Sequence, residues 1–425
     1  MCKVENLPRA AWHSRIEVLL FAALALQLGL IAEGIWGGGF PMGDLPFAYQ
    51  PWVESIQNGG GWLGITSEWV YPFPALLPMF AAYFVSPGNL QTGWLILSVV
   101  ANTLMLGWLA NWERDADSLR TKRGTLTAWF VLAFIFVVGP VSLSRLETVT
   151  LLLSLVGMLA LDRERFGTAT AWFTAGVWIK IWPVAPLLAL IAAGQRRLRV
   201  FVVATTASIG TLIVGFLLGG NASLFGFLTV QSGRGIQIEA PIAQWWLWQG
   251  VAKVQDAGLY YDGSMYTFQV RGIGVEQVAT LIGLAQIIAL IITGWLAFAA
   301  ARSGAAWRDV VTVATLTAVL DLIVFNKVGS PQYMMWLVLP AAMGLFFGVP
   351  RWRFYVVYTL ALGFVTWMIY PVFYGQILAL EPAGVALLGV RNLAVVVLLV
   401  LANVRLTRMR ASGPQQVDSA GVASS

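Results

Sequence analysis

Long apolar stretches recur along the chain and constrain its fold more than any other feature. One runs from Ile16 to Trp36, and stretches of similar length cover residues 199–219, 275–300 and 385–404. A helix needs about 20 apolar residues to cross the hydrocarbon core of a bilayer. Only 11% of the residues are charged, against about 25% in soluble domains. The sequence therefore predicts an all-α polytopic membrane protein rather than a soluble enzyme.

We expect about twelve membrane passes. They cover residues 16–36, 90–112, 125–139, 148–161, two short passes within 168–194, 199–219, 275–300, 309–325, 333–349, 354–374 and 385–404. The segment 71–85 is also apolar, but it is short and contains three prolines. We expect it to form a helix at the outer surface, because counting it as a pass would place the basic residues between Arg114 and Arg123 outside.

Basic residues set the expected orientation of the chain. Lys3, Arg9 and Arg15 precede the first pass, and loops rich in Lys and Arg stay on the cytoplasmic side of a membrane. An even number of passes then leaves both termini in the cytoplasm, with the protein in the plasma membrane. Two large external loops are expected to carry juxtamembrane helices: 37–89 and 220–274.

Composition narrows the kinds of site and partner. With one cysteine, Cys2, and one histidine, His13, the chain has no thiolate or imidazole cluster, so we expect no metal site and no cofactor. Carboxylates alone could still hold a hard cation. The net charge is +6. Cytoplasmic loops rich in Lys and Arg are typical of membrane proteins and explain this excess, so the expected partner is the lipid bilayer and not nucleic acid. Residues 1–410 should form one integral membrane domain, followed by a disordered cytoplasmic tail at 411–425.

All but seven of the 26 Lys and Arg residues are expected on the cytoplasmic side. The seven others are Arg145, Lys180, Arg234, Lys253, Arg271, Lys327 and Arg391. A charge within a membrane segment usually has a partner or a ligand. Four of these cations have no obvious anion beside them and are candidate phosphate ligands: Lys180, Arg234, Lys327 and Arg391. The alternative for each is packing, or snorkelling of a long side chain to the interface.

Two acids stand at the outer ends of predicted passes. Asp44 follows the first pass, in MGDLPFAYQPW, and Glu147 ends the short loop SRLE. Both are candidate catalytic acids or bases. The alternative for Asp44 is a capping or solvated position in its loop, and the alternative for Glu147 is a local ion pair with Arg145.

Aromatic side chains suit the faces of sugar rings, and acids suit their hydroxyls. The candidate sugar or acceptor contacts in the two external loops are Tyr49, Tyr71, Glu239, Trp245 and Trp246. Tryptophan at an outer membrane surface is more often part of an aromatic belt than a ligand, so that alternative remains for the two tryptophans.

Several segments together resemble a known family. They are GDLPFAYQPW, VYPFP, RLETVTLLLSLVGMLAL, TAGVWIKIWPVAPLL, RGIQIE and NKVGSPQYMMWL. From about residue 16 to about 345 the chain is similar to the GT-C membrane glycosyltransferases, and most similar to glycosyltransferase family 87, the polyprenyl-phosphate-mannose-dependent mannosyltransferases.

The resemblance implies a function and two site residues. It implies transfer of a sugar, mannose in that family, from a polyprenyl-phosphate donor to a glycolipid or glycan acceptor on the outer face of the membrane. In the family an acid of the first external loop is the base, and Asp44 matches its position. Glu147 stands where relatives carry Asp in an Arg-x-Asp pattern, which makes it a candidate second acid.

The chemistry of such a donor agrees with the candidate residues. Phosphate is a good leaving group, so the transfer needs a base for the acceptor proton and cations for the departing phosphate, but no general acid. A single displacement would invert the anomeric carbon. The alternative is a transporter or flippase for a lipid-linked sugar, with charges such as Asp321 and Arg391 along its pathway. The large external loops and the lack of an internal repeat favour the enzyme.

Overall fold

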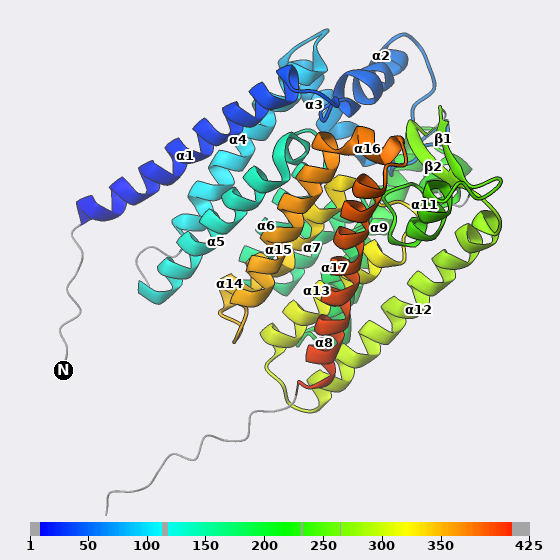
Figure 1. The fold of residues 1–425 in the computed structure, drawn as a ribbon. Coiled ribbons are helices and arrows are strands. Elements are labelled where there is room, and N and C mark those ends of the chain that lie inside the picture. The colour runs from blue at the N-terminus through cyan, green and yellow to red at the C-terminus, as the bar shows by residue number, and fades with distance from the viewer. Residues whose placement is uncertain (1–8, 113–117, 231–232, 264, 410–425) are drawn as a thin grey trace, which may run out of the picture.

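The long predicted passes form as helices in the computed structural model, which describes residues 9–112, 118–230, 233–263 and 265–409, with the backbone alone at 9–15 and 118–120. Within these ranges seven segments are long and apolar enough to cross a membrane. Five of them lie in α1 (Arg9–Trp36), α4 (Leu90–Ala110), α9 (Arg197–Leu217), α12 (Val275–Arg302) and α17 (Pro382–Thr407) (Figure 1). The other two are Thr121–Leu143, which continues past the end of α5 (Ser118–Val138), and Arg353–Val372, which continues past the end of α15 (Arg353–Trp367). The bounds of these seven apolar segments agree with seven of the predicted passes to within a few residues. The predicted tail at 411–425 lies outside the described residues.

The other five predicted passes form as shorter helices. These are α6 (Leu146–Asp162), α7 (Phe166–Val177), α8 (Val184–Ala193), α13 (Trp307–Val324) and α14 (Val338–Phe347), the last preceded by the 3-10 turns η6 (Pro331–Leu337). Side chains of α6, α13 and α14 are almost all buried among the longer helices. Their length and hydropathy do not establish a crossing, so the total of twelve stays a prediction.

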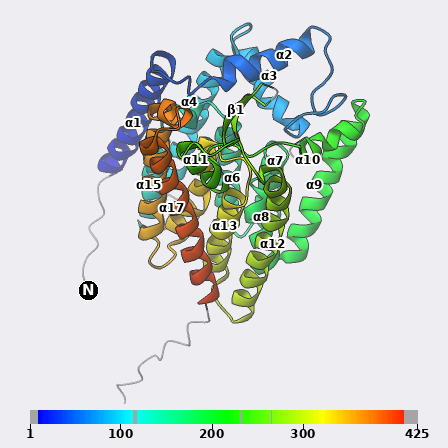
Figure 2. The same ribbon diagram turned by 45° about the vertical axis from the view of Figure 1, so that its right-hand side comes forward.

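Most short elements gather at one end of the bundle, as Figure 2 shows from a second side. They are η1 (Leu45–Tyr49), α2 (Gln50–Gln57), η2 (Phe73–Ala75), α3 (Leu76–Val85), η3 (Gly139–Leu143), η4 (Ala222–Phe225), α10 (Gly226–Thr229), η5 (Pro241–Ala243), α11 (Gln244–Val251), η7 (Met368–Val372) and α16 (Tyr374–Leu378). Both of the predicted large loops therefore carry short helices.

A small sheet corrects the all-α prediction. Strands β1 (Gly258–Asp262) and β2 (Thr267–Arg271) pair antiparallel, with Gly258 opposite Arg271. Aromatic and β-branched residues favour strands because their side chains pack across a pleated surface, and the rings of Tyr261 and Phe268 lie 5.0 Å apart across the pair. The hairpin belongs to the second large loop.

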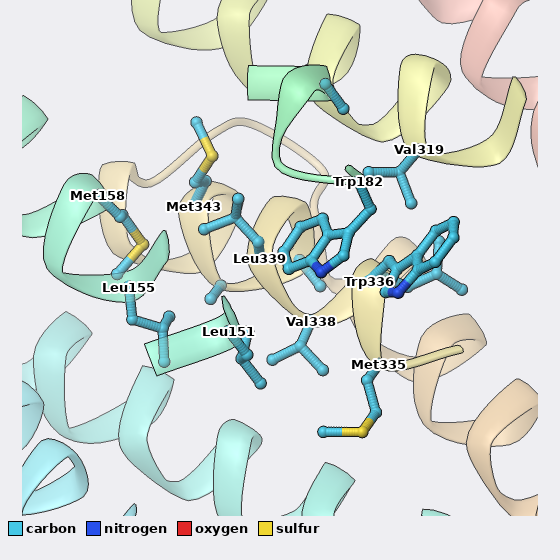
Figure 3. Close-up of a cluster of buried hydrophobic side chains, with 14 of the residues drawn as sticks. Leu151, Leu155, Met158, Trp182, Val319, Met335, Trp336, Val338, Leu339 and Met343 are labelled. Carbon is cyan, nitrogen blue, oxygen red and sulfur yellow. The ribbon is translucent and has the colours of Figure 1, made fainter. Parts of the chain in front are cut away.

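A buried core lies beneath the short elements, inside the helix bundle. Trp182, between α7 and α8, stacks on Trp336 of η6 with ring centroids 6.2 Å apart, and side chains of α6 and α14 surround them (Figure 3). Trp182 Nε1 donates a hydrogen bond to Thr150 Oγ1 at 2.8 Å, so the polar end of a fully buried ring is satisfied. The packing fixes η6 and the α7–α8 turn, both of which contribute to the site described next.

Candidate active site

A cavity of about 2020 Å³ lies where the short elements gather. Its wall comes from distant parts of the chain: the segment after α1, η1, the segment before α3, the α7–α8 turn, the loop before α11, β2, the start of α12, η6, and η7 with α16. Cavities for single small ligands are typically about 300–1,000 Å³. This one therefore has room for two small ligands at once.

Asp44 and Arg145 form an ion pair on the cavity wall. Asp44 Oδ1 lies 3.0 Å from Arg145 Nη1, and the Arg145 side chain is 6% exposed against 38% for Asp44. Asp44 immediately precedes η1, and Arg145 immediately precedes α6. The pair ties the first large loop to the α5–α6 connection. It also replaces the local pairing of Arg145 with Glu147 that was the alternative from sequence.

Lys180 and Glu147 form a second ion pair, deeper in the protein. Lys180 Nζ lies 2.5 Å from Glu147 Oε1, and Glu147 is fully buried. Lys180 lines the cavity and its Nζ lies 5.3 and 5.5 Å from the ring centroids of Tyr71 and Tyr333. Glu147 lies behind it and does not line the cavity. Lys180 has no anion beside it in the sequence, but Glu147, 33 residues earlier in the chain, supplies the counter-charge in the folded protein. A cation this buried needs such a partner.

Arg234 and Lys327 bring two further cations to the wall. Arg234 Nη2 donates a hydrogen bond to Thr267 Oγ1 of β2 at 3.1 Å. The backbone N–H of Gln237 donates to the carbonyl oxygen of Lys327 at 2.9 Å, which joins the two segments. Burial lowers the pKa of Lys327, and the charge of Arg234 lowers it further. Two neighbouring cations of this kind attract an anion.

Glu239 lines the cavity close to these cations, whereas Arg391 does not. Tyr374 Oη donates to Glu239 Oε1 at 2.7 Å, and Arg391 Nη2 donates to the backbone carbonyl of Glu239 at 2.9 Å. Burial raises the pKa of the Glu239 carboxyl, while the Tyr374 hydrogen bond and the Arg391 charge act in the opposite direction. Arg391 is 2% exposed and supports Glu239 from behind, so the structure does not bring it to a phosphate in the cavity.

The predicted aromatic contacts separate into two groups. Tyr71 lines the cavity. Tyr49 is buried against Trp52 and Trp94, with ring centroids 5.7 and 5.3 Å away. Trp246 is buried and donates to the Ile273 carbonyl, while Trp245 is 67% exposed outside the cavity. Tyr49, Trp245 and Trp246 are therefore not placed to contact a sugar in this cavity.

Several aromatic residues that line the cavity were missed from the sequence, among them Trp69, Tyr333 and Trp336. Tyr333 stacks on Trp336 with ring centroids 4.0 Å apart, and both line the cavity together with Trp69. The buried Nε1 atoms of Trp69 and Trp336 have no hydrogen-bond partner among the described residues. Trp69 precedes the predicted Tyr71 by two residues, and Tyr333 and Trp336 follow the predicted Lys327 within nine residues, so the missed residues belong to segments that already held candidates.

The described residues contain no group of three or more His, Cys, Asp or Glu side chains that could hold a metal ion. The cavity instead offers donors. Four buried N–H groups have no hydrogen-bond partner within the described part of the chain: Nε of Arg145 and Arg234, and Nε1 of Trp69 and Trp336. Buried polar groups are normally satisfied. The site is thus suited to a ligand rich in acceptor oxygens, as sugars and phosphates are.

Comparison with known proteins adds an independent finding. The family model for glycosyltransferase family 87 matches residues 69–326, more than half of the chain. Comparison with curated proteins gives no match. The matched region contains Arg145, Lys180, Arg234 and Glu239, whereas Asp44 precedes it. The chain therefore belongs to glycosyltransferase family 87, and it is a glycosyltransferase with several helices able to cross a membrane.

Proposed function

We propose that the protein transfers mannose from a polyprenyl-phosphate donor to a lipid or glycan acceptor by a single displacement with inversion. The observation that carries the proposal is the composition of one cavity wall, which joins the carboxylate of Asp44 to the cations Lys180, Arg234 and Lys327. Transfer from a sugar phosphate needs both kinds of group. The carboxylate is needed where the acceptor oxygen bonds to the anomeric carbon, and the cations are needed where the bond from that carbon to the phosphate breaks. The choice of mannose rests on the resemblance alone.

The cations supply the phosphate end of the reaction. Arg234 and Lys327 lie together, and Lys180 reaches the wall from the α7–α8 turn. Negative charge grows on the phosphate as the bond to the anomeric carbon breaks. Fixed cations in a partly buried site stabilise that charge without having to reorganise.

The wall formed by α12 suits a lipid-linked donor. Ala279, Ile282, Gly283, Gln286 and Ile287 line the cavity from one face of this helix. The first and the last of them are eight positions apart, about 12 Å along the helix axis at 1.5 Å per residue. Because α12 is one of the helices able to cross a membrane, a donor with a lipid chain could approach the cavity along it.

Asp44 supplies the acceptor end of the reaction. Its carboxylate is partly exposed in the cavity and held by Arg145. A carboxylate so placed can take the proton of the acceptor hydroxyl as that oxygen attacks the anomeric carbon. The proton goes to Asp44, the sugar goes to the acceptor, and the polyprenyl phosphate leaves.

The proposed orientation places the cavity on the outer face of the plasma membrane, with both termini in the cytoplasm. The asymmetry of Lys and Arg supports it. Single cysteines introduced at position 234 and at position 196 test it on intact cells, in a Cys2→Ser background. An impermeant maleimide should reach position 234 alone; labelling of position 196 alone would reverse the orientation.

The central test is transfer in detergent. Purified protein with polyprenyl-phosphate-mannose and a membrane lipid extract as the source of acceptor should release polyprenyl phosphate and form a mannosylated product. A transporter or flippase moves its cargo between compartments and would leave the donor unchanged where no compartments exist. Intact donor, in a sample that binds the donor, would therefore favour the transporter.

Donor binding should weaken as the pH rises through the lowered pKa of Lys327. The amine loses its proton below the ordinary value of 10.5, and a neutral amine does not attract phosphate. In Lys327→Arg the guanidinium stays charged, so binding should stay nearly constant between about pH 7 and 10. The matched control, Lys253→Arg on an exposed loop, should keep the alkaline decline. Equal pH dependence in all three proteins would remove Lys327 from the donor site.

A further inference from the structure

Glu239 has an unusual position for a carboxylate. It is 2% exposed, and it lines the cavity. Its Oε1 accepts the Tyr374 hydrogen bond, while Oε2 accepts none from any residue in the described ranges. A carboxylate accepts hydrogen bonds only, and a buried one that lacks a partner is costly. The free oxygen therefore calls for a donor from a ligand.

The backbone around Glu239 is held on three sides. Arg391 donates to its carbonyl oxygen, and the neighbouring Ile238 N–H donates to the Phe268 carbonyl at 3.1 Å. On the third side Gly329 packs so closely that a Cβ there would lie 2.2 Å from the carbonyl carbon of Glu239. Only glycine fits at that contact. With the Tyr374 hydroxyl fixing Oε1, little freedom remains for the carboxylate.

Glu239 lies beside the proposed phosphate ligands. It follows Arg234 by five residues, and its partner Gly329 follows Lys327 by two. The hydrogen bond from Gln237 to Lys327 holds the two segments together. In a sugar phosphate the ring is bonded to the phosphate through one oxygen, so the ring hydroxyls must lie next to these cations.

A chain of tyrosines connects Glu239 to the Asp44 side. Tyr374 meets Tyr370 edge to face with ring centroids 5.0 Å apart, and the Tyr370 hydroxyl donates to the carbonyl oxygens of Gly39 and Phe40 at 3.2 Å. That loop leads into Asp44. These contacts link Glu239 both to the cations and to the segment that leads into Asp44, and all of these residues line the same cavity.

We propose that Glu239 accepts hydrogen bonds from hydroxyls of the transferred sugar and thereby determines which sugar the enzyme uses. The inference rests on the proposed function and deepens it. A bond from a hydroxyl to a carboxylate is charge-assisted and stronger than one between neutral groups. A site built to bind a substrate hydroxyl can reject a substrate that lacks it by a factor of up to about 10⁴–10⁵, because the buried group is then left without a partner. Tyr374 and Arg391 are positioning residues for this carboxylate.

Deoxy donors test the inference. The kcat/KM of wild-type protein is measured with polyprenyl-phosphate-mannose and with its 2-, 3-, 4- and 6-deoxy counterparts. We expect at least one deoxy donor to lose a hundredfold or more, about the scale for a lost hydrogen bond to a charged group. In Glu239→Gln that same penalty should shrink at least tenfold, since the charge that the hydroxyl satisfied is gone. If Glu239 served as a base or as a packing residue, the substitution would slow all donors alike and leave every deoxy penalty unchanged, which would overturn the inference.

Two further variants complete the design. Tyr374→Phe removes the hydrogen bond to Oε1 of Glu239 but keeps the carboxylate. It should reduce the loss of kcat/KM with the same deoxy donor, to a smaller extent than Glu239→Gln does. If Glu239→Gln does not fold, Tyr374→Phe provides the test of whether Glu239 binds the sugar hydroxyl. Glu276→Gln makes the same chemical change at an exposed residue outside the cavity and should keep the wild-type pattern of penalties. Wild-type protein that transfers no sugar from any of these donors would contradict the proposed function, whereas transfer with unchanged penalties would contradict the Glu239 inference alone.

Discussion

Asp44→Asn should lower turnover by about a hundredfold or more while donor binding stays intact. A positioned general base contributes about 10²–10⁴-fold to the rate, and the amide keeps the size of the carboxylate but cannot take the acceptor proton. The measurement is kcat for sugar transfer beside the dissociation constant for the donor. Because the phosphate cations lie on other segments, the second quantity should change little.

The ion pair with Arg145 calls for controls, since Asp44→Asn also leaves a buried guanidinium without its anion. Asp44→Glu keeps the charge and moves it by one methylene, so it should retain the folded protein and lose part of the rate. Glu54→Gln changes an acid of α2 whose carboxylate accepts a hydrogen bond from Gln50 at 2.8 Å, outside the cavity; its turnover should stay near wild type. Normal turnover in Asp44→Asn, with a large loss of turnover in the folded fraction of Glu147→Gln, would move the base to Glu147.

The long helices could be predicted because length and apolar character are sufficient evidence for them. The prediction of 199–219 became α9 at Arg197–Leu217, and 275–300 became α12 at Val275–Arg302. The shorter interior helices also form where they were expected. Whether they cross the membrane could not be predicted, because a helix can be apolar either since it packs inside the protein or since it contacts lipid. Sequence pattern alone does not separate these two causes. The hairpin was missed although GLYYD and TFQVR carry the aromatic and β-branched residues typical of strands.

The residues of the site were easier to predict than their pairing. Arg145 and Glu147 are two positions apart, which suggested a local ion pair. In the structure Arg145 has an extended backbone, with φ −129° and ψ 158°, whereas Glu147 belongs to the first turn of α6. The change of backbone conformation between them sends the two side chains to different partners, Asp44 and Lys180. Arg145 and Asp44 are 101 residues apart in the chain, and Glu147 and Lys180 are 33 apart. Pairs so far apart have no characteristic spacing, so the sequence alone could not predict them.

Breaking the Lys180–Glu147 pair should destabilise the protein strongly. Lys180 is 8% exposed and Glu147 is fully buried, so either single substitution leaves a charge without its partner in a poorly solvated place. Removal of one member of a buried ion pair costs about 3–5 kcal/mol. Glu147→Gln and Lys180→Met should each lower the free energy of unfolding by that amount, seen as earlier loss of monodisperse protein on heating in detergent.

The double variant separates the structural contribution of the pair from its chemistry. Replacing both charges by neutral side chains removes the unpaired charge, and such replacements are often neutral for stability. Glu147→Gln combined with Lys180→Met should therefore regain most of the lost stability. It should not regain donor affinity if Lys180 is a phosphate ligand, because the cation is absent from the cavity wall. Glu164→Gln breaks the half-exposed pair with Arg308, whose closest atoms are 3.7 Å apart, and should cost less than about 1 kcal/mol. Recovery of both stability and donor affinity in the double variant would leave Arg234 and Lys327 as the phosphate ligands.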